Sequence, residues 1–213
     1  MSENEEKEPG RPATPGPINE AVQHSSVSAR IPANVARGTL STGAIVFDSL
    51  HEFVIDFLLR LGSPHSVAAR IVLPPPVFLQ LIAALRENLK KYKDQFGPPP
   101  ALPVPPPQPP AGDGRGKIAD MYDQLKLPDE MLSGVYSNAV MIGHSPSEFW
   151  FDFITTFFPR SAVSSRVFLA AQHVPSLLDT LNIAYQSHQR KQAEAQRPPQ
   201  GTPPAPGDEG MRG

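Results

Sequence analysis

The chain of 213 residues contains no cysteine. This absence excludes disulfides, thiolate nucleophiles and cysteine-ligated metals together, and small exported domains usually depend on such cross-links. The first ten residues, MSENEEKEPG, are acidic and lack the apolar core of a signal peptide. We therefore expect a cytoplasmic protein.

Long apolar runs and a strong net charge are also missing. The longest apolar stretch, FWFDFITTFF, is too short to cross a bilayer and contains Asp152. A formal net charge of −2 opposes strong non-specific attraction to a polyphosphate. We therefore expect no membrane partner, and a nucleic-acid partner is possible but not favoured.

Signatures of catalysis are absent as well. The sequence has no GxGxxG, GxxxxGK[ST], GxSxG or HExxH motif, and its six histidines form no i,i+4 pair. His144 lies beside Ser145 and Ser147, but Asp48 takes the place of this histidine in the first repeat described below, so we expect His144 to form a turn. We predict no catalytic residue, cofactor or metal ligand, and the protein is not expected to be an enzyme.

Proline, by contrast, is abundant: the chain has 27 prolines, and most of them crowd into positions 9–17, 98–110 and 198–206. These segments hold few large apolar side chains, so burial cannot repay the entropy of ordering them. We predict a disordered acidic and proline-rich tail over 1–27, a first repeat over 28–97, a proline-rich linker over 98–116, a second repeat over 117–191 and a disordered tail over 192–213. The linker would form polyproline II and serve either as a spacer or, through its PxxP spacing, as a docking motif.

An internal repeat organises the rest of the chain. Shifting the sequence by 96 residues aligns 38–91 with 134–187 without a gap, and twelve of these 54 pairs are identical. In each copy, apolar side chains alternate along a first strand, predicted over 38–47 and 134–143, and along a second, as in Phe53, Ile55 and Phe57. A third, β-branched strand follows, and the period then changes to a helical one. We predict an α+β fold: two copies of an antiparallel β-meander of three to four strands followed by a helix, packed as a pseudo-twofold pair. The second helix should be shorter or fray, because its apolar stripe stops after Tyr185.

A charged pair is predicted inside each sheet. If each second hairpin is centred near residue 63 or 159, Asp56 lies opposite Arg70 and Asp152 lies opposite Arg166. Both carboxylates have apolar neighbours on their own face, and an arginine offers a fork that matches a carboxylate. We interpret the pairs as structural ion pairs that fix the register; the alternative is a carboxylate or guanidinium reserved for a ligand.

The second copy also contains the densest aromatic stretch of the chain. Such a cluster is typical of a core or a protein interface, although aromatics beside arginine can also stack nucleic-acid bases. The candidate interface residues are Trp150, Phe149, Phe151, Phe153 and Tyr136.

The segments GVYSNAVMIGHSPSEFWFDFI and AVSSRVFLAAQHVPSLLDTL resemble the bacterial family called domain of unknown function 3467. Members are mostly short single-copy proteins with a G-x-Y-x-N start, an S-x-x-E-F-x-x-D-F centre and an S-R-x-x-L strand before the helix. The first copy departs from the start of this pattern at residues 39–42. The resemblance implies the fold, here in tandem duplication, but no established activity.

Three functions compete. The leading hypothesis is a non-catalytic, self-associating interaction or assembly module whose partner is itself or another protein. The alternative is a single-stranded nucleic-acid-binding protein, because a duplicated sheet followed by a helix is similar to the PUR and whirly arrangement, a fold-level analogy. An enzyme of unknown class is third.

Overall fold

A computed structural model of the chain describes residues 29–102, 122–157 and 159–196. The predicted tail 1–27 lies outside these residues, as do most of the predicted linker 98–116 and of the predicted tail 192–213. Residues 192–195 belong to a helix that ends at Ala195. The predicted boundary at 191 is therefore a few residues too early.

The first repeat forms the short helix α1 (Ala33–Ala36), strands β1 (Thr39–Ser41), β2 (Gly43–Asp48), β3 (Phe53–Leu59) and β4 (His65–Leu73), and helix α2 (Pro75–Phe96). The second repeat forms β5 (Leu125–Lys126), the 3-10 turn η1 (Asp129–Met131), β6 (Val135–Tyr136), β7 (Ala139–His144), β8 (Glu148–Phe157), β9 (Arg160–Ala170), the 3-10 turn η2 (Ala171–His173) and helix α4 (Val174–Ala195). The fold is α+β, as predicted.

Two sheets share these strands, and each sheet contains strands of both repeats. One sheet has the order β1-β9-β8-β7, and the other has the order β2-β3-β4-β5 with β6 also paired to β4. Within each repeat, β2-β3-β4 and β7-β8-β9 form the predicted antiparallel meanders. Strands β1, β5 and β6 run parallel to their neighbours, which was not predicted, so both sheets are mixed. The alternation of side chains predicts a strand, but it does not say which strand lies beside it.

The chain passes from one sheet to the other at residue 42. The sequence predicted one strand from residue 38 to 47, whereas the structure interrupts it at Thr42 between β1 and β2. The Ser41 hydroxyl oxygen lies within hydrogen-bonding distance of the carbonyl oxygens of both Gly43 (2.8 Å) and Leu58 (3.1 Å), which share its one proton. Strand β1 then pairs with β9 of the second repeat while β2 stays with β3 of the first.

The strand pairings between the repeats follow the sequence offset. Thr39 is the register partner of Val167, and Val135 is the partner of Ile71. Val135 is the repeat equivalent of Thr39, and Ile71 is the repeat equivalent of Val167, so the two pairings correspond. The bridge between Arg30 and Ala162 matches the pairing of Lys126 with Ser66 in the same way. Both long hairpins also carry a bulge at equivalent positions, after Phe57 and after Phe153.

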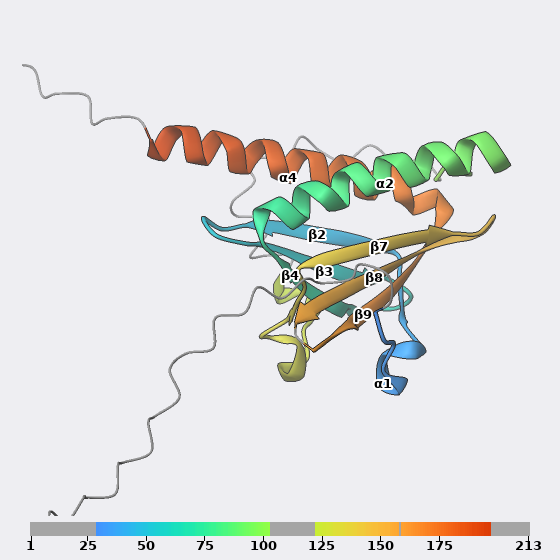
Figure 1. Cartoon of the computed structure of the whole chain (residues 1–213), viewed down its shortest axis with the longest axis horizontal. Helices are drawn as coiled ribbons and strands as arrows, with labels where there is room; N and C mark the ends of the chain where they lie inside the picture. The colour runs from blue at the N-terminus through green and yellow to red at the C-terminus, as the bar shows by residue number, and fades with distance from the viewer. Residues whose placement is uncertain (1–28, 103–121, 158, 197–213) are drawn as a thin grey trace, which may run out of the picture.

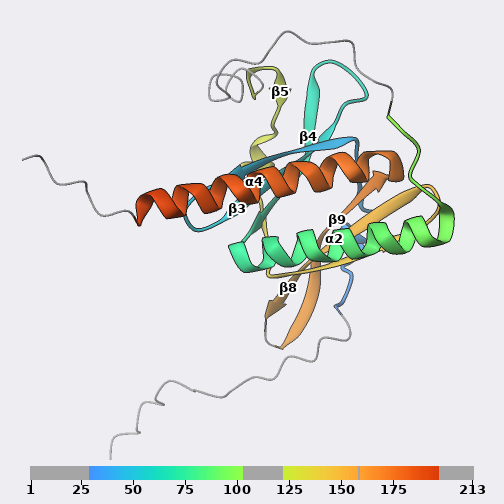
Figure 2. The ribbon, with the colours of Figure 1, turned by 90° about the horizontal axis from the view of Figure 1, so that it is seen from above.

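Helices α2 and α4 lie together on one side of the two sheets (Figure 1) and run in opposite directions (Figure 2). Each helix packs on the other repeat, since α4 contacts β2 and α2 contacts β7. The inner faces of both sheets and the apolar stripes of both helices form one continuous core. Its fully buried residues include Phe53, Phe78, Leu85, Phe149 and Leu181. The two repeats therefore bury their apolar surface jointly, and this burial is the main favourable term in folding.

The second helix is as long as the first. Both α2 and α4 contain 22 residues, so the predicted shortening of the second helix is wrong. His188, on the inner face of α4, is 3% exposed and packs with Phe53 at a ring-centroid distance of 4.7 Å. The buried face of α4 therefore continues through the polar residue His188, beyond Tyr185, where the apolar pattern alone predicted that it ends.

A smaller core covers the outer face of the sheet of the first repeat. Ile45, Leu58 and Val67 are buried there beneath residues of the segment 122–131, among them Tyr122 and Met131. On the outer face of the other sheet, Met141 stands at the position equivalent to Ile45 and is 58% exposed, against 8% for Ile45. The outer faces of the two sheets therefore differ in their cover.

Candidate functional site

The two predicted Asp–Arg pairs are present in the structure. Asp56 is the register partner of Arg70 across β3 and β4, and Asp152 is the partner of Arg166 across β8 and β9. Arg70 donates from Nε to Asp56 Oδ1 (2.7 Å) and from Nη2 to Oδ2 (2.7 Å). Arg166 donates to Asp152 in the same bidentate manner, at 2.6 and 2.7 Å. These hydrogen bonds hold the pKa of both guanidinium groups above the usual value.

The first pair is more enclosed than the second. Asp56 is fully buried, whereas Asp152 is 6% exposed. The Tyr122 hydroxyl donates a further hydrogen bond to Asp56 Oδ2, and Arg70 Nη1 donates to the carbonyl oxygen of Leu132 (3.1 Å). Burial, followed by the hydrogen bond to Asp56, raises the pKa of Tyr122 above its usual value. The beginning of the second repeat thus completes a three-residue network on the sheet of the first.

A cavity of about 230 Å³ lies where the two repeats meet. It is lined by seven residues between Asn34 and Arg70 and by the seven residues that stand 96 positions later in the second repeat. Arg70 and Arg166 both line it, as do Gly38 and Gly134. Because each lining residue has its repeat equivalent among the other lining residues, the cavity lies at the junction of the two repeats.

The cavity offers little reactive chemistry. Its charged side chains are Arg70, Arg166 and Glu130, and both arginines already bind a carboxylate. Its hydroxyl groups, from Thr39, Ser164 and Ser165, have no histidine among the lining residues that would act as a base. Among the described residues, no group of three or more histidine, aspartate or glutamate side chains is arranged to hold a metal ion.

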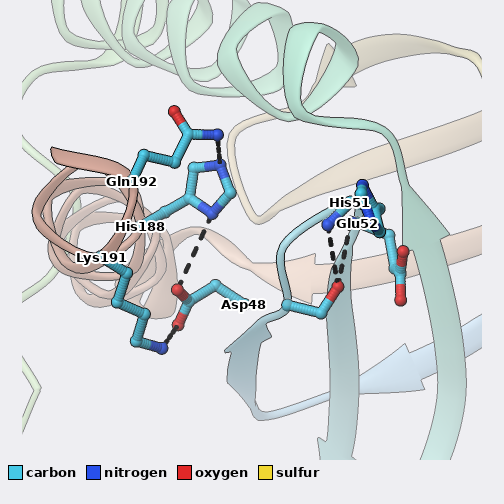
Figure 3. Close-up of polar contacts among 7 residues, drawn as sticks. Asp48, His51, Glu52, His188, Lys191 and Gln192 are labelled. Atoms are coloured by element: carbon cyan, nitrogen blue, oxygen red, sulfur yellow. Dashed lines mark hydrogen bonds and ion pairs between the residues drawn. The ribbon is translucent and has the colours of Figure 1, made fainter. Parts of the chain in front are cut away.

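A polar cluster between α4 and the end of β2 escaped the sequence analysis (Figure 3). Lys191 Nζ lies 2.7 Å from Asp48 Oδ1, and His188 Nδ1 lies 3.8 Å from Asp48 Oδ2. His188 Nε2 is 2.9 Å from the side-chain amide nitrogen of Gln192. Only the fold brings Asp48 to helix residues more than 130 positions later in the chain, although the same offset of 96 residues makes His188 equivalent to Tyr92, which is also buried.

The opposite end of the molecule holds the equivalent contact with other residues. Tyr92 of α2 donates a hydrogen bond to the carbonyl oxygen of Pro146 (2.7 Å). His144 lies 3.3 Å from Asn88 Oδ1 and packs beside Phe149, at a ring-centroid distance of 5.2 Å. His144 is the last residue of β7 and faces α2, so its contacts are with the helix of the other repeat rather than within the turn we predicted.

The five candidate interface residues separate into three places. Phe149, Phe151 and Phe153 are fully buried, and Phe57 of the first repeat packs against Phe151 and Phe153 at ring-centroid distances of 6.1 and 5.7 Å. These three phenylalanines therefore lie between the repeats and are closed to external partners. Trp150 lies on the outer face of its sheet with its ring over Gly143, and Tyr136 is 47% exposed.

The model of a family described as protein of unknown function, domain of unknown function 3467, matches residues 1–99 and 110–195. The chain belongs to this family. The two matched segments agree with a tandem duplication of its domain and confirm the resemblance seen in the sequence. No curated protein and no solved structure matches the chain.

None of the helices in the described residues is both long and apolar enough to cross a bilayer.

Proposed function

We propose that this member of the family is a non-catalytic, self-associating interaction module, in which the two repeats form one pseudo-twofold body. The reciprocal strand pairing carries the proposal, because each repeat supplies a strand to the sheet of the other at equivalent register positions. A repeat by itself would leave that edge of its sheet unpaired and its inner face exposed to water. The fold is thus an assembly of two units that the duplication has joined covalently.

The pairing of the charged side chains in the sheets supports a non-catalytic role. The sheet arginines each form two hydrogen bonds with an aspartate, and these groups lie where the two repeats meet. A saturated pair of this kind fixes register and orientation, whereas a general acid or base needs a free position for the proton it transfers.

Self-association is proposed to use the open edge of β7. Among the described residues, β7 pairs only with β8, and its sequence AVMIGH contains no proline and no acidic residue, lysine or arginine. Proteins usually protect such an edge with charge, proline or a bulge. Met141, in the middle of β7, is 58% exposed.

A second copy of the chain is the occupant that fits this edge. Two β7 strands related by a twofold axis would pair antiparallel, and each would supply the backbone groups that the other needs. The row behind Gly143 is apolar, since Trp150 neighbours Phe168 and Phe168 neighbours Leu40 in the register of the sheet, whereas the row behind Met141 is the Asp152–Arg166 pair. The equivalent edge strand β2 is less suitable, because Ile45 is covered and Asp48 binds Lys191 of α4.

The test is sedimentation velocity of the full chain over a wide range of concentrations. We expect a concentration-dependent dimer that Met141→Lys abolishes, because the added charge would be buried at the new interface. Ile183→Lys is the matched control, since Ile183 is an equally exposed apolar residue, at 64%, but lies on α4. A chain that stays monomeric throughout, or a dimer unchanged by Met141→Lys, contradicts self-association through β7.

A further inference from the structure

A hollow of about 430 Å³ lies on the outer face of the sheet of the first repeat, where β6 joins β4. Its lining combines apolar side chains with an aromatic ring and a few polar groups, among them Val54, Val72, Tyr136, His51, Glu52 and Ser133. Apolar walls with a small number of polar groups are typical of a binding site.

The charge of the hollow is negative. The described residues that line it include one acidic side chain, Glu52, and neither lysine nor arginine. In the described part of the chain no cation pairs with the Glu52 carboxylate, which points away from Asp48 (Figure 3). Arg70 lies two residues before Val72 in β4, but it is held by Asp56 and does not line the hollow. The hollow therefore favours a cation that the described residues do not supply.

An exposed aromatic ring borders the same hollow. Tyr136 is 47% exposed, and the ring of Phe157, which is 57% exposed, lies parallel to it at a centroid distance of 6.3 Å. Large rings that stay open to water without serving the core indicate a contact surface. The face of such a ring attracts cations, and a planar cation can stack on it.

The backbone that carries these two groups is firmly held. Ser49 Oγ accepts hydrogen bonds from the backbone nitrogens of His51 (3.2 Å) and Glu52 (3.1 Å). On the other side of the hollow, the Thr155 hydroxyl donates to the carbonyl oxygen of Tyr136 (3.0 Å). A site whose backbone is fixed before binding loses less entropy when a ligand arrives.

The equivalent place in the other repeat differs in size and charge. Larger side chains replace the two valines and an arginine replaces the serine: Trp150 and Phe168 stand for Val54 and Val72, and Arg37 stands for Ser133. The acidic residue is retained as Glu148. The apolar floor with an acidic border and no arginine of its own chain thus occurs at one of the two equivalent places.

We propose that this hollow binds an arginine side chain of a partner polypeptide. The guanidinium would stack on the ring of Tyr136 and donate a pair of hydrogen bonds to the Glu52 carboxylate. The methylene stem of the arginine would lie against Val54 and Val72. Arginine fits better than lysine, because an ammonium group has neither the planar face nor the fork of donors. The site does not depend on self-association, since β7 belongs to the other sheet.

NMR titration of the isotope-labelled full chain with the peptide acetyl-Gly-Arg-Gly-amide tests the proposal. We expect the backbone amide signals of Glu52, Val72 and Tyr136 to shift with millimolar affinity, the scale of a single side chain. The same peptide with citrulline in place of arginine keeps the shape and loses the charge, and it should bind about tenfold more weakly. A lysine peptide should fall between the two.

Substitutions at the hollow separate its chemistry from a general attraction to cations. Glu52→Gln should weaken binding of the arginine peptide about tenfold, and Ser133→Arg, which copies Arg37, should abolish it by supplying a cation from the chain itself. The matched control is Glu148→Gln, which removes the equivalent charge from the other repeat and should leave the affinity unchanged. Amide signals that stay in place elsewhere in the spectrum show that each variant is folded.

Four results would overturn the proposal. The first is the absence of shifts around the hollow at millimolar arginine peptide, and the second is an equal response to the citrulline peptide. The third is an affinity that Glu52→Gln leaves unaltered or that Glu148→Gln lowers equally. The fourth is a set of shifts at these amides that follows the concentration of the chain without any peptide, which would assign the hollow to a contact between copies.

Discussion

At the scale of single residues, the buried carboxylates are the most constrained groups of the molecule. Asp56 has no exposure to water and is held by two arginine nitrogens and the Tyr122 hydroxyl. Removing one partner of such a pair leaves the other buried without a counter-charge. The geometry therefore supports the structural interpretation over a carboxylate kept free for a ligand.

The substitution Asp56→Asn is expected to lower the free energy of unfolding by about 3 kcal/mol, because Arg70 would lose its buried counter-ion. Asp152→Asn should cost less, since Asp152 is slightly exposed. Urea denaturation measures both. Glu87→Gln, in an exposed helical pair with Lys91, serves as the control and should change nothing measurable. Stability unaffected by Asp56→Asn would favour a ligand role.

We expect the Tyr122 phenol to make the protein less stable in alkaline solution. Its pKa is raised in the folded protein by burial and by Asp56, so folding favours the neutral phenol. This contribution is complete below the pKa of the unfolded state, about 10, and is lost as the pH rises above it. Chemical denaturation across this range should show a steeper decline for the natural chain than for Tyr122→Phe. Equal slopes, with the exposed Tyr136→Phe as reference, would refute the assignment.

At the scale of elements, the strands that cross between the repeats depend on two glycines. Gly38 and Gly134 both adopt φ +67°, just before β1 and β6. A Cβ atom on Gly134 would lie 2.8 Å from Arg70 Cγ, and one on Gly38 would lie 2.4 Å from Phe168 Cε2. These positions need both the left-handed conformation and the missing side chain, because the crossing chain runs against the neighbouring sheet.

Gly134→Ala is therefore expected to destabilise the fold by about 2 kcal/mol, from backbone strain and overpacking together. The thermal unfolding midpoint measures the loss. Gly62→Ala is the matched control, since a Cβ there meets nothing within 4 Å and the substitution should be close to neutral. If the two variants unfold at the same temperature, the passage of the chain between the sheets does not depend on the close approach at Gly134.

At the scale of the whole molecule, neither repeat is complete alone. Each sheet contains strands of both repeats, each helix covers strands of the other repeat, and the principal core is continuous across them. The linker between α2 and the second repeat therefore connects two halves that already share their buried surface.

Cutting the chain within the linker, for example after residue 110, tests this interdependence. Co-expressed halves should purify together and unfold in one cooperative transition, because the shared core and the crossing strands survive the cut. Each half alone should be either unfolded or a homodimer that substitutes itself for the missing repeat. A half that is a folded monomer by circular dichroism and sedimentation equilibrium would contradict the shared core.

The sequence by itself determined the duplication, the class of the fold and the local register. Patterns within one hairpin sufficed to place Asp56 opposite Arg70, because a short antiparallel connection leaves few alternative registers once one face must be apolar. The family was likewise readable from local motifs.

Only the tertiary structure decided where β1 and β6 pair, and that α4 is as long as α2. A strand of two or three residues has too little pattern to select a partner, and β1 finds its partner more than 120 residues away in the sequence. Tertiary packing also decided two side-chain contacts: that of Asp48 with His188 and Lys191, and that of Tyr136 with Phe157. Periodicity reports which face of an element is buried, whereas the identity of the covering surface depends on how distant segments pack together.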